Sequence, residues 1–105
     1  MVTVIVKYKT PKTYTQEEIS AMLQLGAEHM FKGMPHLLNK QFCFDIATSE
    51  GLSVYLWDSW ENAEAFFNDE FLESFKQGMG AVPTLEYYET ILTVDNRAGD
   101  IVMGE

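Results

Sequence analysis

The side chains best suited to proton transfer lie in the stretch of residues 36–57. Asp45 is a candidate general base, provided that burial raises its pKa, although a solvated position near a turn would explain it equally well. His36 precedes a predicted strand and is the better placed of the two histidines to move protons. His29 falls near the end of a predicted helix, where the helix dipole favours a cation. We therefore predict Asp45 and His36 as the catalytic pair.

The same stretch carries residues that could bind a small organic molecule. Trp57 and Tyr55 could stack on a ligand, or could belong to the protein core. Asn39 and Gln41 could hydrogen-bond a pyrrole, phenol or carbonyl, or could face water. The predicted ligand-binding residues are Trp57, Tyr55, Asn39, Gln41, Cys43 and Lys40.

Two of these residues have strong alternative explanations. Lys40 shares one face of the predicted strand with Phe42 and Phe44, so its stem could cover apolar surface while its ammonium reaches water. Cys43 has no basic neighbour in the sequence and is better explained as a small hydrophobic residue than as a nucleophile. The chain has no Cys pair, no His-x-His and no phosphate-binding glycine loop. We expect neither a metal nor a cofactor.

Residues 37–57 predict a β-hairpin, with the turn at residues 48–51. Two registers are possible. A four-residue connection pairs Phe44 with Leu56 and leaves Asp45 on the same face as Tyr55 and Trp57. A two-residue connection places Phe44 beside Tyr55 and turns Asp45 to the opposite face. We prefer the first register, because it gives one uniformly apolar face toward the helices and one mixed face for a site.

The remaining elements predict an α+β fold of the ferredoxin-like β-α-β-β-α-β order. Residues 2–9 alternate as a strand, and a capping box at Thr15 and Glu18 begins a helix that extends to about Phe31. Ser59 caps a second helix, interrupted at residues 68–69, and residues 84–94 form the last strand. The expected division is a domain over residues 1–94 and an acidic tail over residues 95–105, either loose or packed on a partner subunit.

Two helices cover only one face of such a sheet, so the other face needs a partner. We expect Ile5, Tyr55, Trp57, Tyr88 and Leu92 to form an apolar surface there. Burying that surface against a second copy predicts a homodimer through the sheet face, with a ligand cavity between the two sheets.

Composition narrows the possible partners. The chain has 105 residues and a formal charge of −9, which disfavours nucleic acid and anionic membranes. From Asp58 onward, eleven acidic residues are opposed only by Lys76 and Arg97, a pattern that a solvated surface explains and that would also suit a basic partner. One cysteine and no long apolar run predict a cytoplasmic protein.

The sequence resembles the dimeric α+β barrel superfamily, which includes the antibiotic-biosynthesis monooxygenases. The resemblance is strongest over residues 35–67, with Pro35 opening the second strand and Lys40 within it. It then follows the run Gly-Leu-Ser-Val-Tyr-Leu-Trp-Asp-Ser at residues 51–59 and an alanine-rich acidic helix at residues 61–67.

The resemblance implies oxidation of an electron-rich phenolic substrate by O₂ without metal or flavin, in an aromatic pocket that assists deprotonation. Trp57 matches a pocket tryptophan of those enzymes. Several members carry a histidine near the position of Phe67 or Asn68, and this chain has none there. A catalytic assignment carried over from the family would therefore lack this histidine.

The whole chain is also similar in size and pattern to a small protein of prodigiosin biosynthetic clusters, which make a tripyrrole pigment. This resemblance implies a role in making the bipyrrole half, either as an enzyme or as an accessory protein that binds a partner enzyme or an intermediate. An aromatic or pyrrolic ligand is the partner it implies.

Overall fold

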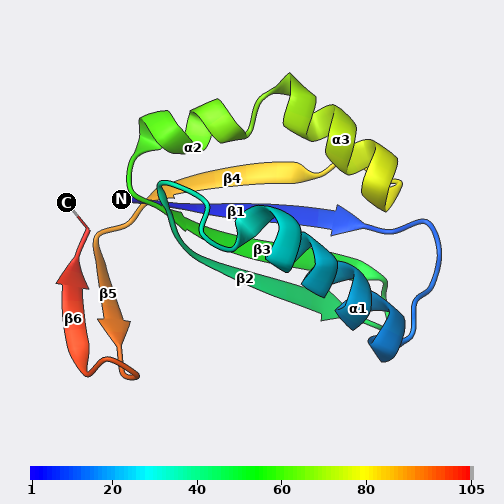
Figure 1. Ribbon diagram of the computed structural model, residues 1–105, viewed down its shortest axis with the longest axis horizontal. Coiled ribbons are helices and arrows are strands. Elements are labelled where there is room, and N and C mark those ends of the chain that lie inside the picture. The colour runs from blue at the N-terminus through cyan, green and yellow to red at the C-terminus, as the bar shows by residue number, and fades with distance from the viewer. Residues whose placement is uncertain (105) are drawn as a thin grey trace.

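The computed structural model describes residues 1–104, which form a layer of helices on an antiparallel sheet (Figure 1). In chain order the elements are β1 (Val2–Lys9), α1 (Gln16–Gly26), the π-helix η1 (Ala27–Phe31), β2 (Leu37–Asp45), β3 (Glu50–Trp57), α2 (Trp60–Phe66), α3 (Asp69–Met79), β4 (Thr84–Glu89), β5 (Leu92–Asp95) and β6 (Asp100–Met103). The main sheet has the order β2-β3-β1-β4, so the expected α+β, ferredoxin-like fold is confirmed.

The core lies between one face of the sheet and the helices. Alternation places Val2, Val4 and Val6 of β1 on this face, and all three are fully buried. Aromatic rings from the strands and helices pack against these valines. The rings are those of Tyr55, Trp57, Phe67, Phe31, Phe66, Phe71, Phe75 and Tyr87.

Local capping sets the helix boundaries as the sequence predicts. Thr15 and Glu18 form the reciprocal capping box of α1, and η1 continues that helix to Phe31. The Ser59 side chain accepts a hydrogen bond from the Asn62 amide and begins α2. The Asn68 side chain starts α3 in the same way, which confirms the break predicted at residues 68–69.

The register of the β2–β3 hairpin differs from both predicted registers. Asp45 pairs with Glu50 and Phe44 with Gly51, so the connection is residues 46–49. Ser49 takes the positive φ of this turn, at 61°. Gly51 lies in the strand instead, opposite Tyr8, and the ring of Tyr8 covers it and leaves no room for a side chain.

This register overturns the expected mixed face. Tyr55 and Trp57 face the helices together with Phe42 and Phe44, and both are almost fully buried. Asp45 falls on the opposite, open face with Val54. The preferred register, which paired Phe44 with Leu56, was therefore wrong, although the observed connection does have four residues. The two-residue alternative had the faces right and the pairs shifted by four residues, an even shift that preserves the faces.

A β-bulge in β2 changes which side chains point inward. Leu37 pairs with Trp57, whereas Asn39 pairs with Leu56, so Leu38 is the extra residue. Leu37 packs against the core and Lys40 is half-buried on the same side. Without the bulge, residues 37 and 40 would lie on opposite faces.

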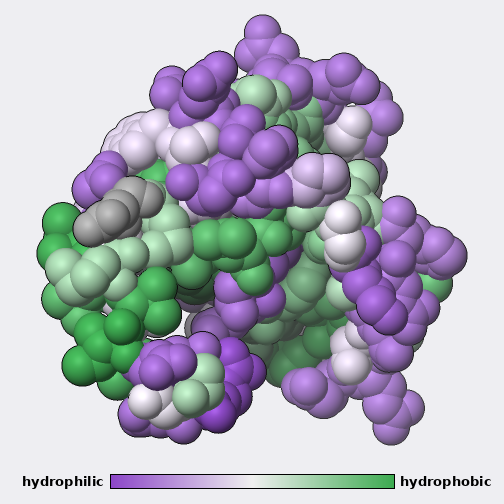
Figure 2. Space-filling model, turned by 60° about the vertical axis from the view of Figure 1, so that its left-hand side comes forward, coloured by the Kyte–Doolittle hydropathy of each residue, from purple (hydrophilic) through white to green (hydrophobic). Residues whose placement is uncertain are grey.

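The C-terminal segment forms a separate hairpin. The strand predicted over residues 84–94 ends at Glu89, and β5 pairs with β6 instead of extending the main sheet. The predicted tail thus contains a strand. The hairpin projects beside the N-terminus (Figure 1), and Figure 2 shows hydrophobic surface on this side of the molecule. Its exposed apolar residues are Leu92, Val94, Ile101, Val102 and Met103.

We predict that Gly51→Ala destabilises the protein and that Gly26→Ala does not. A Cβ at residue 51 would overlap the ring of Tyr8, which is held by an edge-on contact with Phe75, so we expect a loss of about 1–3 kcal/mol. A Cβ at residue 26 meets no atom within 4 Å, and alanine favours the helix by about 0.5–1 kcal/mol. Urea unfolding of both variants checks this, and equal midpoints for Gly51→Ala and wild type would contradict it.

Candidate functional site

A cavity of about 300 Å³ lies between the helices and the sheet within one subunit. It opens between α1 and α3, where Gly26 and Gly78 form part of its wall and a Cβ at either position would meet no atom within 4 Å. Its walls are predominantly apolar and aromatic, as is typical of sites for small organic ligands. The lining residues are Tyr8, Met22, Leu23, Gly26, Met30, Phe31, Lys40, Phe42, Ser53, Tyr55, Phe71, Ser74, Phe75, Gly78 and Met79.

Among the described residues that line this cavity, Lys40 alone carries an amine. Its Nζ lies 3.3 Å from the ring centroid of Phe31, 3.9 Å from that of Phe42 and 4.3 Å from that of Tyr55. Among residues 1–104, no carboxylate lies within ion-pair distance of it. The amine is therefore enclosed by rings without a countercharge, instead of extending into water.

This environment weakens the basicity of the amine. Burial lowers the pKa of Lys40 from 10.5 to about 6, because the ammonium loses its hydration and gains no anionic partner. The three ring faces attract a cation, each by about 0.5–2 kcal/mol, and this attraction offsets part of the desolvation cost. A substantial share of the amine is consequently uncharged near neutral pH.

The other polar groups of the cavity wall are hydroxyls. Tyr55 and Tyr8 come from the central strands, and burial raises the pKa of both phenols, so they stay protonated. Ser53 and Ser74 contribute alcohols from β3 and α3. Neutral hydroxyls and one amine can donate or accept hydrogen bonds to a ligand without adding negative charge.

Trp57 belongs to the core beside the cavity and is not among its lining residues. It is 2% exposed, lies parallel to Tyr55 with the ring centroids 6.2 Å apart, and contacts Phe66 and Phe67. Its indole Nε1 has no hydrogen-bond partner among the described residues. An unpaired buried donor of this kind costs about 1–3 kcal/mol.

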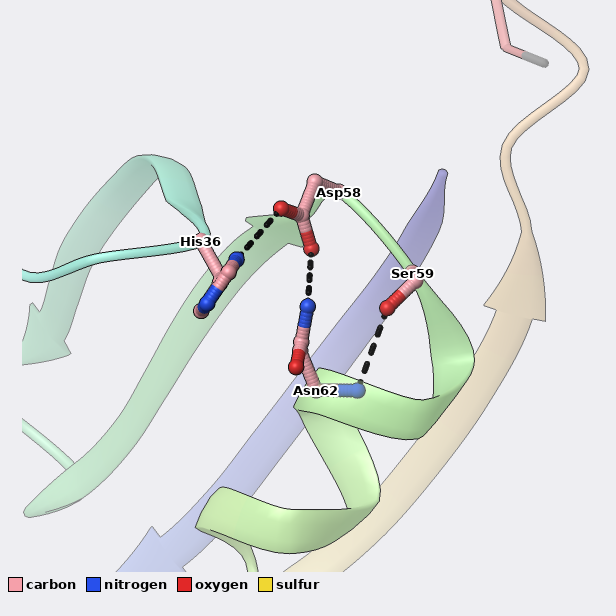
Figure 3. A network of polar contacts seen from close by, with 4 residues as sticks. All are labelled: His36, Asp58, Ser59 and Asn62. Carbon is pink, nitrogen blue, oxygen red and sulfur yellow. Dashed lines mark hydrogen bonds and ion pairs between the residues drawn. The ribbon is translucent and has the colours of Figure 1, made fainter.

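His36 and Asp58 form a surface network outside the cavity (Figure 3). His36 Nδ1 lies 2.7 Å from Asp58 Oδ2, and Asn62 Nδ2 donates to Asp58 Oδ1 at 2.8 Å. The hydrogen bond from Asn62, followed by that from His36, holds the pKa of Asp58 below its usual range. The network ties the loop before β2 to the start of α2, which is a structural function, and the catalytic role predicted for His36 stays a prediction.

The remaining predicted site residues also lie outside the cavity. Asp45 is exposed, and its Oδ1 accepts the Ala47 amide at 2.9 Å, which stabilises the β2–β3 turn. Cys43 is exposed and lines, with Asp45, a broad depression at the end of the sheet. Asn39 borders a groove between η1 and β2, and Gln41 is exposed on the open face. Of the eight predicted residues, only Lys40 and Tyr55 line the cavity.

The sequence analysis missed the helical wall of the cavity. Nothing in the sequence singles out Gly26, although the structure has open space beside it. Two glycines that face a cavity from separate helices produce no local sequence pattern from which the cavity could be predicted. The phenylalanines of η1 and α3 carry only the periodicity of core residues.

The described part of the chain contains neither a metal-binding cluster nor a membrane-spanning helix. Within residues 1–104, no group of three or more His, Cys, Asp or Glu side chains is placed to hold a metal ion. No helix among these residues is long and apolar enough to cross a bilayer.

Comparison with solved structures gives the fold a clear set of relatives. SnoaB, a cofactor-independent oxygenase from Streptomyces nogalater, matches with a TM-score of 0.58 and 11% identity over 83% of this chain and 89% of its own. A candidate antibiotic biosynthesis monooxygenase from Deinococcus radiodurans matches with a TM-score of 0.57 and 12% identity, over 85% and 91%. The chain has the fold of these monooxygenases.

A third match has higher identity. A candidate monooxygenase from Shewanella loihica is 22% identical, with a TM-score of 0.51, over 88% of this chain and 95% of its own. No protein-family model matches the sequence, and no curated protein matches it significantly. The fold expected from the resemblance at residues 35–67 is thus confirmed, and the activity is a separate question.

We predict that Lys40→Met stabilises the protein, and more so at low pH. The folded state lowers the pKa of Lys40 to about 6, so between that pH and about 10 the unfolded state binds more protons and wild-type stability rises with pH. The advantage of Lys40→Met should therefore be largest below pH 6 and shrink as pH rises, by at most about 1.4 kcal/mol per pH unit.

Urea unfolding from pH 5 to pH 9 measures this difference. Lys32→Met is the matched control, because Lys32 is exposed at the end of η1 and its replacement removes the same charge from water. A stability difference between Lys40→Met and wild type that does not change with pH would contradict the prediction.

Proposed function

We propose that the protein binds a small aromatic or heteroaromatic molecule in the cavity between its helices and its sheet. The observation that carries this proposal is the cavity of about 300 Å³, with walls built from rings and few polar groups. Flat ring surfaces favour stacked or edge-on contacts with an aromatic ligand. The volume fits a ligand of one or two rings, at the lower limit of typical ligand sites.

In the enzymatic form of this proposal, the protein catalyses a cofactor-independent oxygenation or cyclisation. The shared fold with a cofactor-independent oxygenase supports oxygenation. Such chemistry needs a base that deprotonates the substrate and makes it electron-rich. The uncharged amine of Lys40 is the group in the cavity that can accept a proton, whereas Asp45 and His36 lie outside it.

The alternative is an accessory protein that binds a reactive intermediate or a partner enzyme without turnover. The short supply of acid–base groups in the cavity favours it. Both forms belong to secondary metabolism, and a bipyrrole of the prodigiosin type is the ligand suggested by the whole-chain resemblance. The lone Cys43 supports the cytoplasmic location expected from the sequence.

We further propose a homodimer through the open sheet face. Ile5, Val54, Leu56 and Tyr88 remain partly or fully exposed on that face, and the apolar C-terminal hairpin projects from the end of the molecule near the N-terminus. A second copy would cover both surfaces at once. Tyr55 and Trp57 are not part of this interface, in contrast to the sequence-based expectation, because they face the helices.

Gly26→Leu should abolish ligand binding without unfolding the protein. The added side chain enters open space in the cavity and occupies the volume that the ligand needs. Ser20→Leu adds the same side chain on the exposed side of α1 and should bind as wild type does. Titration of small phenols and pyrroles, followed by NMR shifts, measures binding.

Oxygen consumption, together with chromatographic analysis of the products that would reveal a cyclisation, separates the two forms of the proposal. Turnover by wild type that is lost in Gly26→Leu supports the enzyme, and binding without turnover supports the accessory protein. Equal ligand binding by Gly26→Leu and wild type would show that the cavity is not the binding site. Trp57→Ala is unsuitable for this test, because a tryptophan that is 2% exposed should cost about 3–5 kcal/mol when truncated.

Val54→Glu should convert a dimer into a monomer. The substitution places a carboxylate at the centre of the open face, where a partner copy would leave it desolvated and unpaired. Ser20→Glu adds the same charge on α1 as a control. Sedimentation equilibrium should give twice the chain mass of 12.0 kDa for wild type and the control, and a single chain mass for Val54→Glu. A monomeric wild type would refute the interface.

A further inference from the structure

Lys40 differs from every other lysine of the chain. Its Nζ is surrounded by the rings of Phe31, Phe42 and Tyr55 and borders a cavity that can admit a ligand. Exposure to water keeps an ordinary lysine charged at neutral pH, and a charged amine has no lone pair with which to attack. The five exposed lysines are Lys7, Lys9, Lys12, Lys32 and Lys76.

We propose that Lys40 is a nucleophile that captures a small aromatic or heteroaromatic aldehyde in the cavity as a reversible imine. This inference rests on the proposed function, because it uses the same cavity and the same class of ring-bearing ligand. A desolvated amine in a hydrophobic pocket is the usual way in which proteins activate lysine toward carbonyl groups. The observations that carry it are the ring cage, the missing carboxylate and the adjoining cavity.

The chemistry balances without a cofactor or an oxidant. The lone pair of Nζ attacks the carbonyl carbon and forms a C–N bond, and the carbonyl oxygen takes up a proton to give a carbinolamine. The amine nitrogen loses its protons, the hydroxyl leaves as water and a C=N bond forms. The net change is condensation of one amine and one aldehyde with release of one water, and hydrolysis reverses it.

The cavity also explains the preference for an aromatic aldehyde. The ring of such a ligand can pack on the apolar and aromatic walls contributed by α1, η1 and α3, while its carbonyl reaches the Nζ at the wall formed by β2. The neutral hydroxyls of Ser53 and Tyr55 line the same cavity as the amine and can hydrogen-bond the oxygen as it leaves. An anionic aldehyde gains nothing comparable, because the wall carries no partner for its charge except the amine itself.

Borohydride trapping tests the proposal. The protein is incubated at pH 7 with pyrrole-2-carboxaldehyde or benzaldehyde and then reduced, which converts the imine into a stable secondary amine. Intact mass and peptide mapping should place the first adduct on Lys40. We expect labelling at least about 10-fold faster than at the exposed lysines, since less than about one part in 10³ of an ordinary lysine is uncharged at that pH.

Four variants show how the labelling is to be interpreted. Lys40→Met and Lys40→Arg should both lose the rapid adduct, and Lys32→Met should retain it. Gly26→Leu retains the amine and narrows the cavity, so labelling of Lys40 should slow at least about 10-fold relative to wild type. Pyridoxal phosphate should still label the exposed lysines of this variant as fast as those of wild type. Circular dichroism verifies that each variant is folded.

The outcomes separate this inference from the proposed function. Rapid Lys40 labelling that depends on the cavity supports both. Ligand binding by NMR with labelling spread evenly over all lysines overturns the imine and leaves the binding site intact. If the protein shows no ligand binding and no selective labelling of Lys40, both proposals are overturned.

Discussion

The packing of aromatic rings on a single face of the sheet governs the rest of this structure. Strict alternation in β1 and β3 places three buried valines, Tyr55 and Trp57 on that face. The helices cover this face, and η1, α2 and α3 direct their phenylalanines toward it. The ring layer therefore sets the positions of the helices. It also determines what surrounds any polar side chain that the strand pattern turns inward.

Lys40 is that side chain, and the bulge at Leu38 is what turns it inward. A regular strand would alternate from Leu37 and point Lys40 into solvent on the open face. The extra residue restores the inward direction after Leu37, so β2 can contribute Leu37 to the core and Lys40 to the cavity. Bulges commonly re-aim side chains next to functional sites. Here the result is an amine held among Phe31, Phe42 and Tyr55.

The sequence was sufficient for the fold because its signals are local. The capping box at Thr15, the cap at Ser59 and the alternation of β1 each act within a few residues. The hairpin register was not accessible in this way. Gly51 was interpreted as a turn residue, but its requirement for glycine comes from Tyr8, more than forty positions away in the sequence. Ser49 takes the turn conformation instead, and a non-glycine residue in that conformation gives little warning.

The expected position of the candidate site depended on that register, and six of its eight predicted residues lie outside the cavity. An error in which face Tyr55 occupies moved the expected cavity from the helix side of the sheet to the dimer interface. Lys40 was chosen as a binding residue for its match to a family pattern, and it does line the cavity, for which that pattern gives no reason. Its surroundings follow from contacts with η1 and from the bulge, and neither is visible in the order of residues along β2.

The energetic cost of Lys40 argues that the amine is retained for a purpose other than stability. A methionine of similar length would fill the same ring cage without a group that must be desolvated. The chain instead keeps an unpaired amine, with a pKa lowered to about 6, beside a cavity that two glycines leave open. Either feature alone has a packing explanation. Together, the unpaired amine and the open cavity reduce the stability of the folded protein and place an uncharged nucleophile or base where a ligand can reach it. This combination is the one expected of a functional site.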